Sequence, residues 1–232
     1  MRKICGMLLY VFVMLSMLSA GHFRASAETG PVPVRPVTGG ECTVHIDLDT
    51  LKMSVYLDME LYKTFPVSGG TPETPSPVGT WLVTEVLNWG EGFGGTWIGL
   101  DVPWGRYGIH GTRKPWLVGQ KNVSHGCIRM KNGDVDELRG LVSPGTVVHI
   151  KHDALPWRNI GRDSKGSNVY EVQIMLGDMG FYTGAIDGIC GGGMVRAIKG
   201  FQRTYSLVPD GVVRKSTYEI IVREHDLFTA RG

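Results

Sequence analysis

The sequence has few of the residues that build disulfide frameworks or metal clusters. It contains 4 cysteines in 232 residues, and no Cys-x-x-Cys or His-x-x-x-His pair occurs in it. An excess of one charge is also missing, because 24 Lys and Arg against 22 Asp and Glu leave a formal net charge of +2. Charge this small and this scattered gives no reason to expect a nucleic-acid partner. No metal and no cofactor is expected.

The composition is that of a globular chain. With 42% hydrophobic and 20% charged residues, 232 residues suffice for one medium core or two small ones. Two domains are therefore expected.

The first residues have the pattern of an export signal. Two basic residues precede an apolar stretch at 4–20, and Ala25-Ser26-Ala27 supplies a small-x-small cleavage site. The sequence predicts a signal peptide at 1–27, followed by a Pro- and Gly-rich spacer at 28–41. The alternative is an uncleaved membrane anchor, because the apolar run is near the lower length limit for spanning a bilayer.

The most informative feature is a thiol close to two imidazoles. Cys127 lies in the run Ser124-His125-Gly126-Cys127, and His110 precedes it. A thiol is a useful nucleophile at neutral pH when a neighbouring imidazole accepts or shares its proton. This pattern indicates a cysteine nucleophile, with His110 and His125 as the candidate bases.

Two other interpretations use the same residues. His110, His125 and Cys127 carry the donor atoms that zinc prefers, but a further ligand at suitable spacing is missing. Cys127 would instead be an inert buried thiol if it were only a core residue. The glycine at 126 lets the backbone approach closely, which favours the nucleophile.

The motif resembles the L,D-transpeptidases with the YkuD-like catalytic domain, which carry a His, a spacer and Ser-His-Gly-Cys. The resemblance covers most of residues 42–151. It rests on these segments: 62–70, 74–79, 107–112, Pro115-Trp116, Gly119 and 124–130.

Short β-prone runs dominate this part of the chain. We expect a mostly β domain at 42–151, sandwich-like, with one short helix at Gly133–Leu141 that Asn132 or Asp134 would cap. The expected strands are Val44–Leu48, Lys52–Leu57, Leu61–Val67, Thr80–Val86, Trp97–Leu100 and Thr146–Lys151.

The resemblance implies a role for each residue of the motif. Cys127 would attack the carbonyl after the third residue of a peptidoglycan stem peptide, and His110 would move the proton. The backbone carbonyl of Gly111 would orient His110, so that no acidic residue is needed. His125 and Gly126 would orient groups or hold the oxyanion. His125 as the base remains an alternative.

The remaining candidates would bind substrate. Arg129 has the planar fork that pairs with a carboxylate, or it forms a surface ion pair. Ser124 bonds either substrate or its own turn. Tyr107 and Trp116 are further candidates, although most tryptophans of this domain are expected to pack in its core. The glycine-rich stretch Gly90–Gly95 is expected to form a flap, and it lacks the Gly-Lys-Ser/Thr ending of a phosphate loop.

The C-terminal third has helical spacing after a linker at 152–167. Asp187-Gly188 and Asp210-Gly211 each precede a helix at the same offset, which predicts two similar turn-helix units. The segment resembles the three-helix peptidoglycan-binding domain over most of 168–223. Met194 and Arg214-Lys215 depart from that family's pattern. The alternative is a stabilising module without wall binding.

Together these features predict a secreted L,D-transpeptidase of the cell wall. It would acylate Cys127 with a stem tetrapeptide and pass the acyl group to an amine, forming a 3→3 cross-link between peptidoglycan stems on their glycan chains. The family resemblance also implies that carbapenem-type β-lactams would acylate the same thiol. Water as acceptor would make the chain an L,D-carboxypeptidase, and an inactive thiol would leave a wall-binding protein. Of the other cysteines, Cys190 is expected to be a buried thiol and Cys42 to stay unpaired.

Overall fold

A computed structural model describes residues 42–90 and 93–231 of the chain. The expected signal peptide at 1–27, the spacer at 28–41 and two residues of the expected flap, 91 and 92, lie outside the described residues. Within those residues, no helix is long and apolar enough to cross a membrane.

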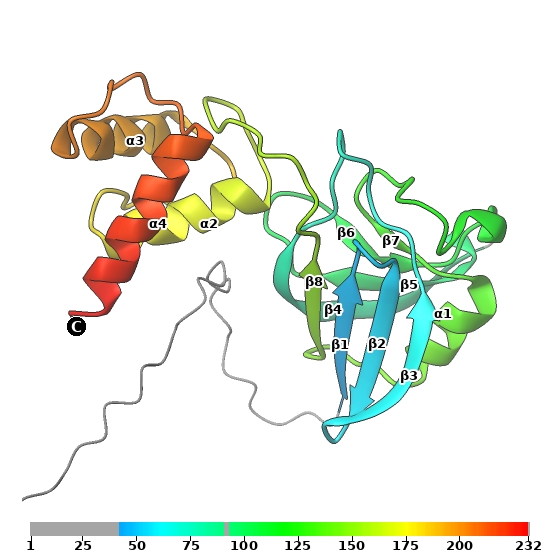
Figure 1. The fold of residues 1–232 in the computed structure, drawn as a ribbon. Helices are drawn as coiled ribbons and strands as arrows, with labels where there is room; N and C mark the ends of the chain where they lie inside the picture. Colours follow the sequence, from blue (N-terminus) through cyan, green and yellow to red (C-terminus); the bar gives the residue numbers. More distant parts are fainter. Residues whose placement is uncertain (1–41, 91–92, 232) are drawn as a thin grey trace, which may run out of the picture. The chain divides into compact units, whose positions relative to one another are not determined.

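The first part of the chain forms one curled sheet of eight strands (Figure 1), in the order β3-β2-β1-β8-β4-β5-β6-β7. The strands are β1 (Cys42–Asp47), β2 (Lys52–Leu57), β3 (Glu60–Pro66), β4 (Gly79–Gly90), β5 (Gly95–Leu100), β6 (Tyr107–His110), β7 (Ile128–Arg129) and β8 (Val147–Lys151). This region is mostly β, as expected.

Strand β4 joins the two halves of the sheet. Its first residues, Gly79–Leu82, pair with β8, and its later residues pair with β5. Because one strand of 12 residues belongs to both halves, the sheet curls on itself and differs from a sandwich of two separate sheets.

Side-chain alternation explains the core of the sheet. Val44 and Ile46 of β1 are buried, and they lie opposite Val55 and Met53 of β2, which are buried as well. Alternate residues of a strand point to the same face, so the strand pattern read from the sequence was enough to place this layer.

All six expected strands are present, with shifts of a few residues at their ends. The two strands missing from the expected set, β6 and β7, have 4 and 2 residues, too few to show a period in the sequence.

The expected helix is α1 (Asn132–Arg139), and it buries Val135 and Leu138. The expected cap was wrong. Lys131 occupies the N-cap position without a side-chain hydrogen bond. The side chain of Asn132 instead accepts a hydrogen bond from the backbone N–H of Thr112 at 2.8 Å, a long-range contact that helix-start rules do not contain.

The C-terminal region is helical. Its helices are α2 (Ser167–Asp178), α3 (Gly192–Thr204) and α4 (Lys215–Thr229), and they share a hydrophobic core of their own. The core contains Val172, Leu176, Ile198, Phe201 and Ile221, all fully buried.

A buried glutamine of α2 holds the first Asp-Gly turn. Nε2 of Gln173 donates to Oδ1 of Asp187 at 2.9 Å, and the N–H of Gly188 donates to Oε1 of Gln173 at 2.7 Å. Oδ1 of Asp187 also accepts from the N–H of Ile189. Gly188 has a φ of +70°, a conformation that glycine adopts at no steric cost.

Gln202 of α3 repeats this arrangement at the second turn. It donates to Oδ1 of Asp210 at 2.9 Å and accepts from the N–H of Gly211 at 2.8 Å, while Asp210 accepts from the N–H of Val212. The repeat seen in the sequence is therefore a repeat of hydrogen bonds as well.

The described residues include three free thiols, at Cys42, Cys127 and Cys190. Cys190 is fully buried, as predicted, and burial raises its pKa to about 11. This thiol is inert at neutral pH.

Candidate active site

Two short neighbouring strands bring the motif residues together. His110 is the last residue of β6, and Cys127 directly precedes β7. The strands are parallel and pair Ile109 with Ile128 and His110 with Arg129. Extending this register by one residue places Cys127 beside Gly108.

The His110 ring is oriented by the next residue in the chain. Its Nδ1 lies 2.6 Å from the carbonyl oxygen of Gly111. Because a carbonyl oxygen only accepts, Nδ1 carries the proton, and Nε2 keeps its lone pair in the neutral ring. Such a ring is poised to act as a base.

The surroundings of His110 favour its neutral form. The ring is 8% exposed. Burial, followed by the charge of Arg129, lowers the pKa of His110, and the carbonyls of Gly111 and Phe93 oppose this only in part. The imidazole is therefore neutral at neutral pH.

Aromatic rings surround the imidazole on two sides. The ring of Trp97 stacks on His110 with centroids 5.9 Å apart at 27°, and Phe93 meets it edge-on at 5.3 Å. Trp89 stacks on Trp97 at 4.1 Å and 3°, and the Arg106 guanidinium lies 4.0 Å from the centroid of Trp89. These stacked side chains form a column that ends at His110.

One carboxylate fixes this column. Oε1 of Glu85 accepts hydrogen bonds from Nε1 of Trp97 at 2.9 Å and from Nη2 of Arg106 at 3.0 Å. Sequence reasoning missed the column, because its members come from three strands and a loop. A tryptophan in a strand pattern looks like an ordinary core residue.

The Cys127 thiol is half-buried, and burial raises its pKa. The N–H of Gly108 and the charge of Arg129 act in the opposite direction without cancelling the effect. Among the described residues, no hydrogen bond joins Sγ of Cys127 to a ring nitrogen of His110 or His125. The resting pair is thus a neutral thiol and a neutral imidazole. Such catalytic hydrogen bonds often tighten only when substrate binds.

Ser124 holds the turn that presents the thiol. Its buried Oγ donates to the carbonyl of Cys127 at 2.5 Å and accepts from the N–H of Gly126 at 3.0 Å. Gly126 has a φ of +120°, and a Cβ there would lie 2.6 Å from Cε1 of Tyr107. Glycine is therefore required at 126 for two reasons, backbone conformation and space.

The other candidates differ in their exposure. His125 is exposed, Tyr107 is half-buried, and burial raises the pKa of Tyr107. Trp116 lies in a short 3-10 helix, Pro115–Leu117, and is 67% exposed. Across residues 42–90 and 93–231, no group of three or more His, Cys, Asp or Glu side chains is arranged to hold a metal ion.

Comparisons with known proteins fit this geometry. A family model described as the L,D-transpeptidase catalytic domain matches residues 42–150, and one described as a putative peptidoglycan binding domain matches residues 165–221. Putative L,D-transpeptidase YqjB of Bacillus subtilis is 31% identical over 159 residues, which cover 62% of this chain and 89% of that protein. Putative L,D-transpeptidase YkuD of Bacillus subtilis is 42% identical over 108 residues, covering 46% of this chain and 63% of its own length.

Among solved structures, an L,D-transpeptidase from Mycobacterium smegmatis is 25% identical, with a TM-score of 0.43, over 49% of this chain and 60% of the other. The match spans less than two thirds of that protein and of YkuD.

Proposed function

This chain belongs to the L,D-transpeptidase family, and on that premise we propose that it acts on peptidoglycan through a thioester on Cys127. The observation that carries the proposal is the pairing of β6 with β7. This pairing sets the Cys127 turn beside the strand that ends in His110, whose Nδ1 donates to the carbonyl of Gly111.

The first half-reaction breaks the amide bond after the third residue of a stem tetrapeptide. Nε2 of His110 takes the proton of the Cys127 thiol as Sγ attacks the carbonyl carbon. A thioester bond forms and the C–N bond breaks. The proton held by His110 then passes to the departing amine of the terminal residue.

The second half-reaction runs in the reverse sense. An amine of a neighbouring stem gives its proton to His110 and attacks the thioester carbonyl. The new amide is a 3→3 cross-link, and the Cys127 thiol recovers its proton from His110. A neutral Cys127 thiol and a neutral His110 imidazole suit this order of proton transfers, because His110 must accept a proton before it donates one.

Backbone N–H groups of the Ser124–Cys127 turn would hold the oxyanion. The N–H of Gly126 already donates to Ser124. The N–H groups of His125 and Cys127 have no acceptor within the described part of the chain, so these two are the better donors. Gly126 then serves the turn by its conformation.

Arg129, Tyr107 and Trp116 are the proposed contacts to the stem peptide. The positive charge of Arg129 also favours the thiolate as it forms, because it lowers the pKa of Cys127. Exposed Trp116 offers a flat apolar surface to the stem or glycan.

The remaining regions fit a protein that works at the cell wall. We propose that residues 1–27 direct export and are removed, and that 28–41 is a spacer. The proposed catalytic domain is 42–151, the linker 152–167, and the proposed three-helix domain at 168–223 holds the chain on peptidoglycan.

Intact-protein mass spectrometry with a disaccharide-tetrapeptide tests the proposal. Wild type should show a transient adduct that lacks the terminal residue, and Cys127→Ala should show none while still binding insoluble wall. Product masses identify the acceptor: a cross-linked dimer indicates transpeptidation, and a free tripeptide indicates the carboxypeptidase. No adduct, with wall binding retained, would indicate a non-catalytic binding protein.

A further inference from the structure

A groove of about 430 Å³ lies beside the turn that holds the nucleophile. One wall comes from the segment Glu73–Val78 together with Tyr107 and His125, and the other comes from the segment 155–169. Pockets of roughly 300–1,000 Å³ hold ligands of drug size, so this one has room for a few peptide residues.

The groove adjoins the turn that holds Cys127. His125, which lines it, is two residues from Cys127. The backbone of Gly126 lies directly against this wall: a Cβ at 126 would be 2.6 Å from Cε1 of Tyr107 and 3.2 Å from the carbonyl oxygen of Pro75. A peptide in the groove would therefore lie next to the turn that carries the thiol.

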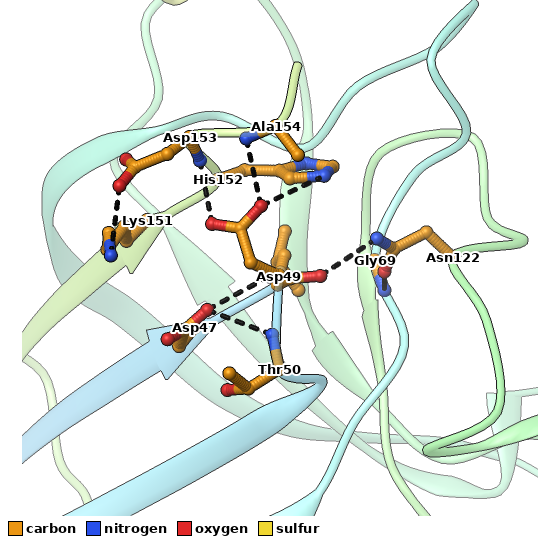
Figure 2. A network of polar contacts seen from close by, with 10 residues as sticks. Asp47, Asp49, Thr50, Gly69, Asn122, Lys151, His152, Asp153 and Ala154 are labelled. Atoms are coloured by element: carbon orange, nitrogen blue, oxygen red, sulfur yellow. Dashed lines mark hydrogen bonds and ion pairs between the residues drawn. The ribbon is translucent and has the colours of Figure 1, made fainter.

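The chain just before the second wall is fixed by hydrogen bonds to the turn between β1 and β2. The carboxylate of Asp49 accepts from the N–H groups of Asp153 and Ala154 at 2.8 and 2.9 Å (Figure 2). Nη1 of Arg158 donates to the carbonyl of Glu73 at 3.2 Å, which joins the two walls directly.

Aromatic packing fixes the other end of this wall. The ring of Tyr170 lies 5.6 Å from Trp81 and 5.7 Å from Trp104. Gly188 also lies close to Trp104, since a Cβ at 188 would be 2.2 Å from its ring. The described residues all belong to one compact unit, and the groove is preformed within it.

The second wall supplies positive charge. Arg158 and Lys165 are exposed cations that line it, and Asn159 and Asn168 line it as well. The acid on the groove is Glu73, whose backbone already engages one Nη of Arg158. A guanidinium has five N–H donors, so Arg158 retains donors for a ligand.

We propose that this groove is a subsite for a peptide carboxylate, and that Arg158 and Lys165 of the segment 155–169 determine its specificity. The ligand class is a short peptide with a free carboxylate, as on a peptidoglycan stem, so the inference rests on the proposed function. The segment that joins the two regions of the chain is thereby part of the substrate site.

Full-length Lys165→Glu and Arg158→Gln variants test the subsite. The matched control is Arg203→Glu, an exposed charge reversal in α3 that does not line the groove. We expect the KM for a stem tetrapeptide, as acyl donor or as acceptor, to rise about three- to tenfold in the groove variants alone. If the KM for the acyl donor rises, the groove holds the donor stem. If the KM for the acceptor rises, the groove holds the acceptor stem. An unchanged KM for both stems in both groove variants would overturn the subsite.

Two further measurements separate this inference from the proposed chemistry. Alkylation of Cys127 by iodoacetamide should proceed equally in all variants, because this small reagent does not use the groove. Binding of stem peptide to full-length Cys127→Ala should weaken about three- to tenfold when its carboxylates are amidated, and Lys165→Glu should remove that preference. Failure of the proposed chemistry would abolish acylation in wild type and leave this binding difference intact. Equal binding of the acid and amide forms would overturn the subsite alone.

Discussion

His110 and Trp97 are directly paired across β6 and β5, and their rings stack with centroids 5.9 Å apart at 27°. Trp97 is 2% exposed, and its indole N–H donates to Glu85. The proposed base thus lies against a buried ring that is itself held by a hydrogen bond. Stacking limits the ring's rotation, and the face of an indole favours the cationic imidazolium that would form in the proposed reaction.

Replacing Trp97 should therefore affect turnover through His110. We expect Trp97→Leu to lower kcat about two- to tenfold, because the variant loses a stacking contact worth roughly 0.5–1.5 kcal/mol. Trp97→Phe keeps the stack and should stay nearer to wild type. Steady-state kinetics with thermal unfolding as a fold check would measure this. Equal kcat in the Leu variant and wild type would show that Trp97 is only a packing residue.

Arg129 should set the pH dependence of the thiol. Its charge lowers the pKa of both Cys127 and His110, so Arg129→Gln should raise both. The thiolate would then form only at higher pH, and alkylation of Cys127 at neutral pH should slow by about tenfold per unit of pKa.

Iodoacetamide alkylation over a range of pH checks this directly. The midpoint for wild type should lie above the ordinary thiol value of 9.0, and that for Arg129→Gln higher still. Arg139→Gln, an exposed change in α1, serves as the control. A midpoint below 9.0 in wild type would show that burial does not control the pKa of Cys127. A midpoint below neutral pH would contradict the neutral resting pair.

The two buried glutamines that hold the Asp-Gly turns, Gln173 and Gln202, should contribute similarly to stability. Gln202→Ala removes three hydrogen bonds and leaves the buried N–H of Gly211 without its acceptor. We expect a loss of about 2–4 kcal/mol in the free energy of unfolding. Gln173→Ala should cost a similar amount, because its bonds repeat those of Gln202.

Urea unfolding followed by a probe in the helical region would compare the two variants. Exposed Gln120 lies outside that region, and Gln120→Ala should be neutral. A large loss of unfolding free energy in one glutamine variant and none in the other would show that Gln173 and Gln202 are not equivalent.

Acid should destabilise the second Asp-Gly turn, Asp210-Gly211, by protonating Asp210. Hydrogen bonds from the N–H of Val212, from Gln202 and from Arg214 lower the pKa of Asp210 to about 2. The ionised form is favoured in the folded state, so its contribution is complete above the ordinary value of 3.8 and is lost as the pH falls through about 2.

Comparing Asp210→Asn with wild type at several pH values tests this. The variant should be less stable at neutral pH, and the difference should vanish as the pH approaches about 2. A difference that is independent of pH would mean that the turn depends on shape and not on the charge of Asp210.

Much of the fold was accessible from the sequence. Strand alternation located six strands, and helical spacing located α1 and the helical C-terminal region, because both signals extend over several residues. β6 and β7, which carry the candidate site, were not among the six strands located in this way, since strands of 4 and 2 residues have no measurable period. Asn132 was misassigned as a cap because its partner, Thr112, is 20 residues away.

The sequence by itself determined the proposed reacting groups, because a thiol in a Ser-His-Gly-Cys run and an upstream histidine form a local motif. The tertiary structure alone decided their environment. The Trp97 stack, the opposing effects of burial and Arg129 on the two pKa values, and the groove formed by the segment 155–169 all join residues far apart in the chain. Such contacts depend on strand register and on packing between segments, and no local pattern encodes them.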